Sequence, residues 1–303
     1  MSTFQRDLSP ALITDLKSDP LFQEKLLPDI ERGEVFPAIR GGYICFYHKG
    51  SRLFKYDDQG FTTHVKFGFV PRGNNSCDIR ESDLEKKTVI DTFYAGYDEI
   101  KARAALYAGP EAAAVSRLHQ FSPFNKNRKD NPQYALLDAE VAFDARKDGE
   151  ADAEIGQKPA AGRKRTSDRI DIMLYDTQAR GLLFCECKHF SNPEIWSKAG
   201  ARPLVLGQVK KYDDQILQNE ESIVREYKKY VSYMNSLFGV SLPEPSFPYP
   251  KCGLLIFGYD SLQEPKMKEH VKSGSLLGPH VKTVGSTESI KELSKLWEKL
   301  IKE

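Results

Sequence analysis

Residues 182–190 read LLFCECKHF, an almost wholly apolar run that nevertheless carries Glu186 and Lys188 two positions apart. The leucine, phenylalanine and cysteine residues predict a buried strand. Alternate side chains of a strand share one face, so Glu186 and Lys188 are expected on the same side. Burying a charge is costly unless the charge is paired or binds a metal. An acid and a base at these positions therefore indicate a site with chemistry.

The preceding apolar run, residues 169–176 (RIDIMLYD), places a second acid, Asp171, early in a strand. A hairpin that turns near residues 177–181 would bring Asp171 level with Glu186 across the ladder. Two adjacent carboxylates repel unless a cation lies between them, and Mg²⁺ prefers carboxylate and water oxygens. Lys188 can orient or deprotonate an attacking water, or offset charge growing on phosphorus. This equipment suits hydrolysis of a phosphodiester bond.

Asp171 followed by Glu186-Cys187-Lys188 resembles the signature of the PD-(D/E)xK nuclease superfamily in its Asp…Glu-x-Lys form. No proline precedes the aspartate. Gln208 and Tyr212, in GQVKKYDDQ, resemble the Gln-x-x-x-Tyr motif of the RecB-like branch. Their i, i+4 spacing puts both on one helix face. The resemblance covers roughly residues 105–270.

The resemblance implies a divalent-metal-dependent nuclease, a phosphodiester hydrolase that acts on nucleic acid, with DNA favoured over RNA. Asp171, Glu186 and the backbone carbonyl of Cys187 are then expected to hold Mg²⁺ or Mn²⁺. Lys188 is expected to position the attacking water. Catalytic roles in orienting the site and contacting the substrate fall to two residues of the following helix, Gln208 and Tyr212.

The superfamily often places a further acid on the helix before the sheet. Glu111, in GPEAAAVSRL, is the candidate for this additional metal ligand, and Glu140 in the preceding strand is its competitor. Asp168 is an alternative to Asp171 as the first ligand. Asp171 is preferred because it lies between two isoleucines, inside the strand.

Basic residues cluster around the proposed site and predict contacts with nucleic acid. Phosphate contacts of this kind position a strand without reading its sequence. The expected nucleic-acid-binding residues are Arg163, Lys164, Arg165 and Arg169 ahead of the Asp171 strand, and Lys210 and Lys211 on the Gln-x-x-x-Tyr helix. Lys198 and Arg202 lie between the two motifs.

The pattern along the chain predicts an α/β (α+β) fold: a restriction-endonuclease-like mixed central sheet flanked by helices, with an N-terminal β-rich accessory domain. We expect the accessory domain over residues 1–100, as a helix plus a small antiparallel sheet, and the nuclease-like core over 101–303. The first domain is expected to hold a helix at 10–32 and strands near 43–48, 52–57 and 61–69, with helices over 81–121 leading into the core. The core is expected to hold strands at 134–143, 169–176, 182–190, 251–260 and 280–285, and helices from 206 into the 230s and at 289–303.

Composition favours a soluble globular protein, because 40% of the 303 residues are hydrophobic and 29% are charged. No apolar run is long enough for a transmembrane helix, and the N-terminus lacks the apolar core of a signal peptide. Five cysteines, an odd number, suggest reduced thiols and a cytoplasmic location. Cys185, Cys187 and His189 alternate along one strand, so a metal site there is an alternative to small buried side chains. The net charge of +1 predicts only a local nucleic-acid surface.

Other classes of function remain open from the sequence. A catalytically inactive nuclease-fold protein that binds nucleic acid or serves as a scaffold is the main alternative, although binding alone does not need two juxtaposed carboxylates. A small-molecule phosphohydrolase is disfavoured, because no glycine-rich loop is available to hold a phosphate. Glu186 and Lys188 could also form the solvated face of an edge strand, against which their apolar neighbours argue.

Overall fold

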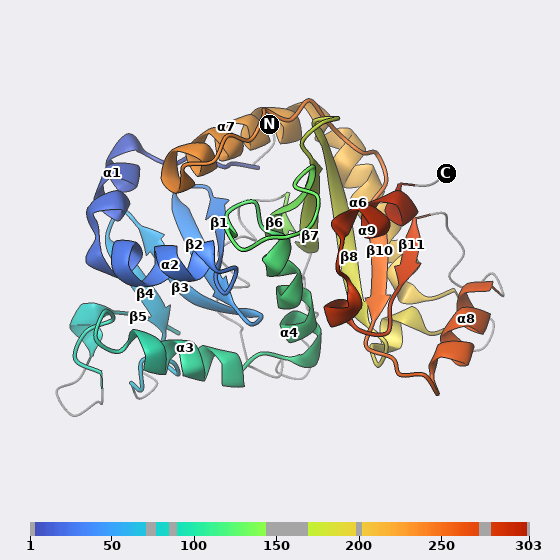
Figure 1. Ribbon diagram of the computed structural model, residues 1–303, viewed down its shortest axis with the longest axis horizontal. Helices are drawn as coiled ribbons and strands as arrows, with labels where there is room; N and C mark the ends of the chain where they lie inside the picture. The colour runs from blue at the N-terminus through green and yellow to red at the C-terminus, as the bar shows by residue number, and fades with distance from the viewer. Residues whose placement is uncertain are drawn as a thin grey trace.

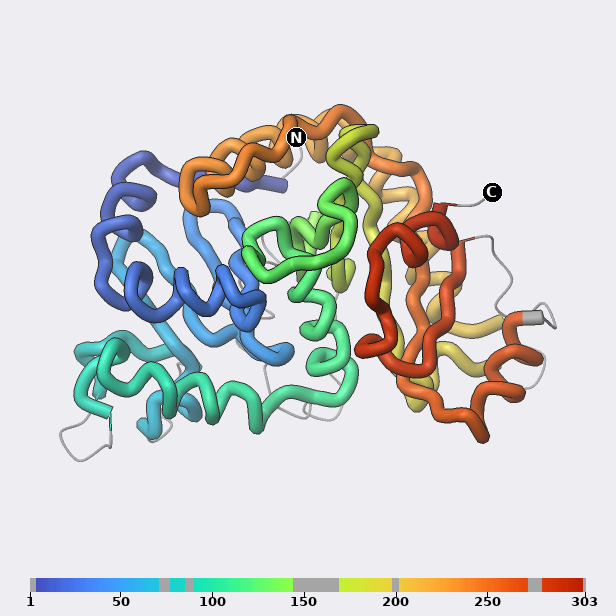
Figure 2. Tube along the Cα trace, in the orientation of Figure 1, coloured from blue at the N-terminus to red at the C-terminus, as the bar shows by residue number. Residues whose placement is uncertain are grey.

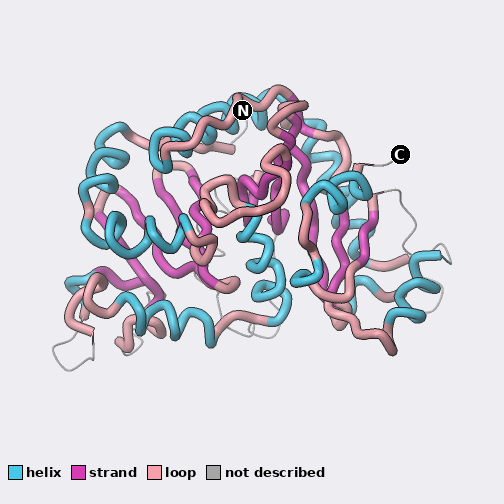
Figure 3. The backbone as a smooth tube through the Cα atoms, in the orientation of Figure 1, coloured by secondary structure: helices cyan, strands magenta, loops and turns pink. Residues whose placement is uncertain are grey.

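A computed structural model describes residues 4–70, 77–84, 90–143, 169–197, 202–272 and 280–301. Two sheets lie side by side, with helices around them (Figures 1 and 3). The mixed α/β class predicted from the sequence is confirmed. The first sheet is antiparallel, and its strands follow one another in chain order: β1 (Phe36–Arg40), β2 (Tyr43–His48), β3 (Ser51–Asp57), β4 (Gly60–His64) and β5 (Asp78–Arg80).

The second sheet is mixed and has the order β11-β10-β8-β7-β6. Its strands are β6 (Tyr134–Ala142), β7 (Arg169–Asp176), β8 (Gly181–His189), β10 (Gly253–Phe257) and β11 (Val281–Thr283), and the short β9 (Phe247–Pro248) also pairs with β8. Strands β6, β7 and β8 are antiparallel, whereas β8, β10 and β11 are parallel. Because β8 is central, both of its faces are covered, which explains its nearly continuous apolar sequence.

Helices cover both faces of the second sheet. On one side, α4 (Pro110–Ser116) and α9 (Leu293–Leu300) pack against Ile172, Leu183 and Leu255. On the other, α6 (Leu204–Gln218) and α7 (Glu220–Phe238) pack against Met173 and Phe184. The other helices in the described residues are α1 (Pro10–Ser18), the π-helix Phe22–Leu26, α2 (Leu27–Glu31), α3 (Tyr97–Leu106), α8 (Glu264–Lys272) and the 3₁₀ turns Glu81–Asp83, Arg117–Phe121, Pro193–Ile195 and Thr287–Ser289.

Several predicted elements are wrong in their extent. The helix expected from 206 into the 230s is two helices, because Asn219 (φ −115°) interrupts it between α6 and α7. The strand expected to reach residue 69 ends at His64, whose carbonyl accepts the Phe67 N–H in a turn. Residues 90–96 precede α3 instead of extending it, with Gly96 packed against Ile90. Strands β1 and β5 were not predicted.

One hydrophobic cluster joins the two sheets. Phe22, Phe46 and Phe54 of the first part belong to the same buried cluster as Phe184 and Tyr227 of the second. The boundary expected at residue 100 falls inside α3, and the division into domains 1–100 and 101–303 stays a prediction. Within the described residues, no helix has the length and apolar character needed to cross a membrane.

His119 is buried in the 3₁₀ turn after α4, where its ring stacks on Phe36 at a centroid distance of 4.8 Å. Burial lowers the pKa of His119 to about 3. The unfolded chain, with an ordinary histidine pKa of about 6.5, therefore binds a proton that the folded chain excludes. Between pH 6.5 and 3, this group should lower the free energy of unfolding by about 1.4 kcal/mol for each unit by which the pH falls.

The contribution of His119 is isolated by comparison with His119→Phe, which keeps a ring against Phe36. Denaturant unfolding at several pH values between 4 and 8 should show that the variant lacks this part of the pH dependence. Equal slopes in the two proteins would show that His119 does not resist protonation in the fold.

Candidate active site

Strands β7 and β8 separate at the position where the acids stand. Their pairing ends at Ile172 and Cys185. Beyond that point, of the strands that the structure describes, β7 pairs with β6 alone, through Ile170, and β8 pairs with β10 alone, through Glu186 and Lys188. Asp171 and Glu186 are the first residues past the separation, one on each strand. The hairpin expected from the sequence thus places both carboxylates at a fork in the sheet.

The polar groups at the fork are closely linked. One oxygen of Asp171 (Oδ2) accepts the backbone N–H of Cys187 at 2.6 Å, a bond that replaces the interrupted ladder. Lys188 Nζ lies 2.7 Å from Oε1 of Glu186 and 3.2 Å from Oε2 of Glu194. The other oxygen of Glu186, Oε2, is buried and has no hydrogen-bond partner among the described residues. Among the described residues, therefore, no donor faces this carboxylate oxygen.

Burial controls the charge of these groups. It raises the pKa of Glu186 to about 7, against the attraction of Lys188 and with repulsion from Glu111 and Glu140. It also raises the pKa of Asp171, and the charges of Glu186 and Glu140 raise that pKa further. Burial opposes the charged form of Lys188, but the carboxylates of Glu186 and Asp171 outweigh it and raise the lysine pKa. Lys188 is thus positively charged, and its single charge does not neutralise all of the acids around it.

Both candidates for the additional acid lie near the fork. Glu111 stands in the first turn of α4, where its Oε2 accepts the N–H of His189 at 2.7 Å and the amide of Asn192 at 3.2 Å. Glu140 lies on β6, and its charge acts on both Asp171 and Glu186. Because Glu111 lies on a helix and Glu140 on a neighbouring strand, the two acids do not occupy equivalent positions.

Gln208 and Tyr212 form hydrogen bonds at the end of β7 that no longer pairs with β8. Tyr212 is buried, and its hydroxyl donates to the backbone carbonyl of Arg169 at 2.7 Å. The amide of Gln208 in turn donates to that hydroxyl at 2.9 Å. Strand β8 has left β7 at this point, so the tyrosine supplies a donor that the ladder no longer provides. The Tyr212 hydroxyl is thus held inside the protein, and its expected contact with the substrate stays a prediction.

Tyr212→Phe should destabilise the fold, because it leaves the Arg169 carbonyl and the Gln208 amide without their partner. Loss of a buried hydrogen-bond partner typically costs about 1–3 kcal/mol. Thermal unfolding measures the effect, with Tyr233→Phe as control, since Tyr233 on α7 is only partly buried. An unchanged melting temperature in Tyr212→Phe would contradict this structural role for the hydroxyl.

The basic residues divide into three groups. Arg163, Lys164 and Arg165 lie outside the described residues, as do Asp168 and Lys198. Arg169 is buried in β7, which does not suit the exposed phosphate contact expected of it. On the solvent side of α6, Lys210 and Lys211 are exposed, and Lys210 Nζ lies 4.0 Å from Asp214.

A divalent cation fits the fork by the chemistry of its donors. Mg²⁺ is commonly bound through one or two carboxylates and keeps several waters, so Asp171 and Glu186 are a sufficient pair. The partnerless Glu186 oxygen is the atom such an ion would satisfy. Across the described ranges, however, no group of three or more histidine, cysteine or acidic side chains is arranged to hold a metal. The alternative on Cys185, Cys187 and His189 does not fit, because both thiols are buried in the core and the histidine ring contacts Ser191.

A scan against family models and searches of curated proteins and of solved structures returned no match. The assignment of this site therefore depends on its own residues.

Two residues that contact the candidate site were not predicted. Asn192 holds Glu111, and Glu194 is the second partner of Lys188; both lie in the short loop that follows β8. Polar residues directly after a strand with a buried acid and base are a signal that could have identified them.

Proposed function

We propose that this protein is a divalent-metal-dependent nuclease that hydrolyses phosphodiester bonds of nucleic acid, with DNA as the favoured substrate. The observation that carries the proposal is the fork in the sheet, where Asp171 and Glu186 meet beside Lys188 and one Glu186 oxygen is buried without a donor. A carboxylate with a purely structural role is normally exposed to solvent or has hydrogen-bond partners for both oxygens.

In this proposal, Asp171, Glu186 and the carbonyl of Cys187 hold Mg²⁺ or Mn²⁺, and a bound ion would supply a Lewis acid for a phosphoryl oxygen. The N–H of Cys187 already bonds Asp171. In an extended strand the N–H and the carbonyl of one residue point to the same side, so Cys187 fixes the carboxylate and presents its own carbonyl nearby. Lys188 keeps its positive charge at the fork, where it can orient the attacking water and stabilise negative charge that develops on the phosphate.

Gln208 and Tyr212 act as positioning residues. Their hydrogen bonds hold the Arg169 end of β7, two residues before Asp171, and thus fix the position of the Asp171 carboxylate. The Gln-x-x-x-Tyr resemblance supports the assignment to a RecB-like nuclease, as does a mixed sheet flanked by helices. Phosphate contacts come from the exposed Lys210 and Lys211 and from Arg163, Lys164 and Arg165.

The five cysteines are free thiols. Persistent free thiols suit a reducing compartment, so we also propose a cytoplasmic location.

A cleavage assay tests the function. Linear and circular DNA, single- and double-stranded, and RNA are incubated with the purified chain in Mg²⁺, in Mn²⁺ or in EDTA. Cleavage that requires the metal supports the proposal. Binding of nucleic acid without cleavage, and with no Mn²⁺-linked rise in melting temperature, would instead identify an inactive nuclease-fold protein or scaffold.

A further inference from the structure

Strand β6 loses its regular alternation beside the fork. In a regular strand, residues two apart share a face. Ala139 packs in the cluster on one side of the sheet, yet Val141 packs in the cluster on the other. The residue between them, Glu140, has a φ of +54°, in the left-handed region that a glutamate rarely adopts. The strand backbone is therefore turned over at Glu140.

Glu140 lies directly beside Asp171. The register pairs Ala139 with Ile172 and Val141 with Ile170, so Glu140 faces the aspartate across the ladder. Alternation breaks in β7 as well, since Ile170 and Ile172 pack in opposite clusters. Two neighbouring strands are thus irregular at the same level, at the two positions that carry acids.

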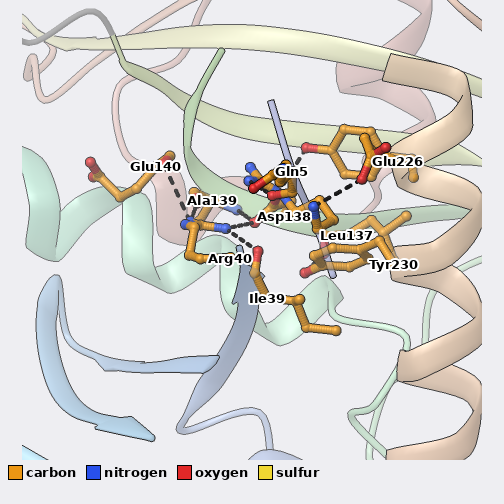
Figure 4. A network of polar contacts seen from close by, with 11 residues as sticks. Gln5, Ile39, Arg40, Leu137, Asp138, Ala139, Glu140, Glu226 and Tyr230 are labelled. Atoms are coloured by element: carbon orange, nitrogen blue, oxygen red, sulfur yellow. Dashed lines mark hydrogen bonds and ion pairs between the residues drawn. The ribbon is translucent and has the colours of Figure 1, made fainter. Parts of the chain in front are cut away.

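A buried arginine from the other sheet holds this irregular backbone. Arg40, at the end of β1, donates from Nη2 to the carbonyl of Ala139 and, at 3.3 Å, to the carbonyl of Glu140. Its Nη1 donates to Oδ1 of Asp138 at 2.9 Å and to the Ile39 carbonyl at 2.8 Å. Figure 4 shows the Glu140 side chain pointing away from this network while its backbone faces Arg40.

The network around Asp138 makes the arrangement rigid. Besides Arg40, the Asp138 carboxylate contacts Arg6 at 3.3 Å and accepts the Tyr227 hydroxyl at 2.8 Å. Tyr230 donates to the carbonyl of Leu137, where the register of β6 also shifts. A strained backbone conformation persists only where its surroundings enforce it, and such strain gathers at functional sites.

We propose that Glu140 joins Asp171 and Glu186 as a third carboxylate when a metal ion binds. Among the described side chains the three acids are not grouped around one point, so the Glu140 side chain turns toward the ion on binding. Arg40 is the positioning residue that fixes the Glu140 backbone. The inference rests on the proposed nuclease function and adds to it a contribution from the first sheet. The planar guanidinium group suits this task, since it can donate hydrogen bonds to an acid and to two successive carbonyls at once. Glu111 has a structural task, because its Oε2 accepts two hydrogen bonds that tie α4 to the end of β8.

The test is Mn²⁺ affinity, measured by calorimetry and by the metal-linked rise in melting temperature. Glu140→Gln should raise the Mn²⁺ dissociation constant tenfold or more. Arg40→Lys keeps a cation for Asp138 but loses the planar guanidinium group, and it should weaken the Mn²⁺ affinity by a similar factor. In the double variant, Arg40→Lys should add no further loss, because it acts through Glu140. The control is Arg52→Lys, which alters a buried arginine paired with Asp78 in the same sheet; it should leave Mn²⁺ affinity unchanged.

The outcomes separate this inference from the function it deepens. Full Mn²⁺ affinity in Glu140→Gln, in a protein that still binds Mn²⁺ and cleaves DNA, overturns the inference alone. Additive losses in the double variant overturn the role of Arg40, since a merely structural arginine would weaken the site independently of Glu140. A wild-type chain that neither binds Mn²⁺ nor cleaves overturns both. If Arg40→Lys does not fold, the affinity of Glu140→Gln still decides whether Glu140 belongs to the site.

Discussion

Lys188→Ala should reduce the rate of DNA cleavage about 10²- to 10³-fold while the protein stays folded and still binds DNA. The reason is that Lys188 is a buried cation held 2.7 Å from Glu186. In the proposed mechanism, negative charge develops there during attack on phosphorus. Losing one preorganised group that stabilises a transition state typically has an effect of this size. Single-turnover cleavage under saturating metal measures it.

The control for Lys188→Ala is Lys268→Ala, which removes an exposed lysine paired with Glu264 on α8. Its cleavage rate should remain that of the wild type. DNA affinity is measured beside the rate in both variants, so that loss of binding is not mistaken for loss of catalysis. A Lys188→Ala protein that cleaves within about threefold of wild type would remove Lys188 from the mechanism.

Glu186→Gln should abolish Mn²⁺ binding and, in EDTA, leave the protein as stable as the wild type or more so. Burial raises the pKa of Glu186 to about 7, so the folded state binds a proton more tightly than the unfolded chain. This group therefore lowers wild-type stability as the pH rises from about 4.5 to 7, and the loss persists above that range. Glutamine keeps the shape and cannot ionise.

The stability gain of Glu186→Gln should therefore be largest at pH 8 and smallest at pH 5. Asp171→Asn should also lose Mn²⁺ binding, because it removes a proposed ligand. Its stability in EDTA should stay level or rise, since burial and the charge of Glu186 raise the pKa of Asp171 as well. Calorimetric titration with Mn²⁺ and melting temperatures in EDTA check both variants, with the exposed Glu288→Gln as control. Unchanged Mn²⁺ affinity in both site variants would contradict their assignment as ligands.

The part of the fold that could be predicted is the part built from local patterns. Strands β2, β3 and β8 were found because alternating or continuous apolar residues end at glycine-rich turns. Strand β1 was missed because Pro37 argues against a strand, yet β1 lies at a sheet edge where proline is tolerated. The break at Asn219 was missed because one asparagine between two helical patterns gives only a weak local signal.

The candidate site divides in the same way. Asp171, Glu186 and Lys188 could be brought together from the sequence because one short hairpin joins them. Arg40 could not be placed at the site, since its contact with Asp138 spans 98 residues of sequence. Local sequence did not reveal the left-handed backbone of Glu140, because that conformation is enforced by a contact from another sheet.

The N-terminal segment contacts a helix that is formed late in the chain. The backbone N–H of Arg6 donates to Glu226 on α7, 220 residues away in sequence, and Figure 2 shows the segment beside that helix. During synthesis at about 5–20 residues per second, Arg6 must therefore wait roughly 10–40 s for its partner to be made. Until then the side of Phe22 that packs against Phe238 of α7 stays uncovered, so the nascent chain exposes apolar surface before α7 is made.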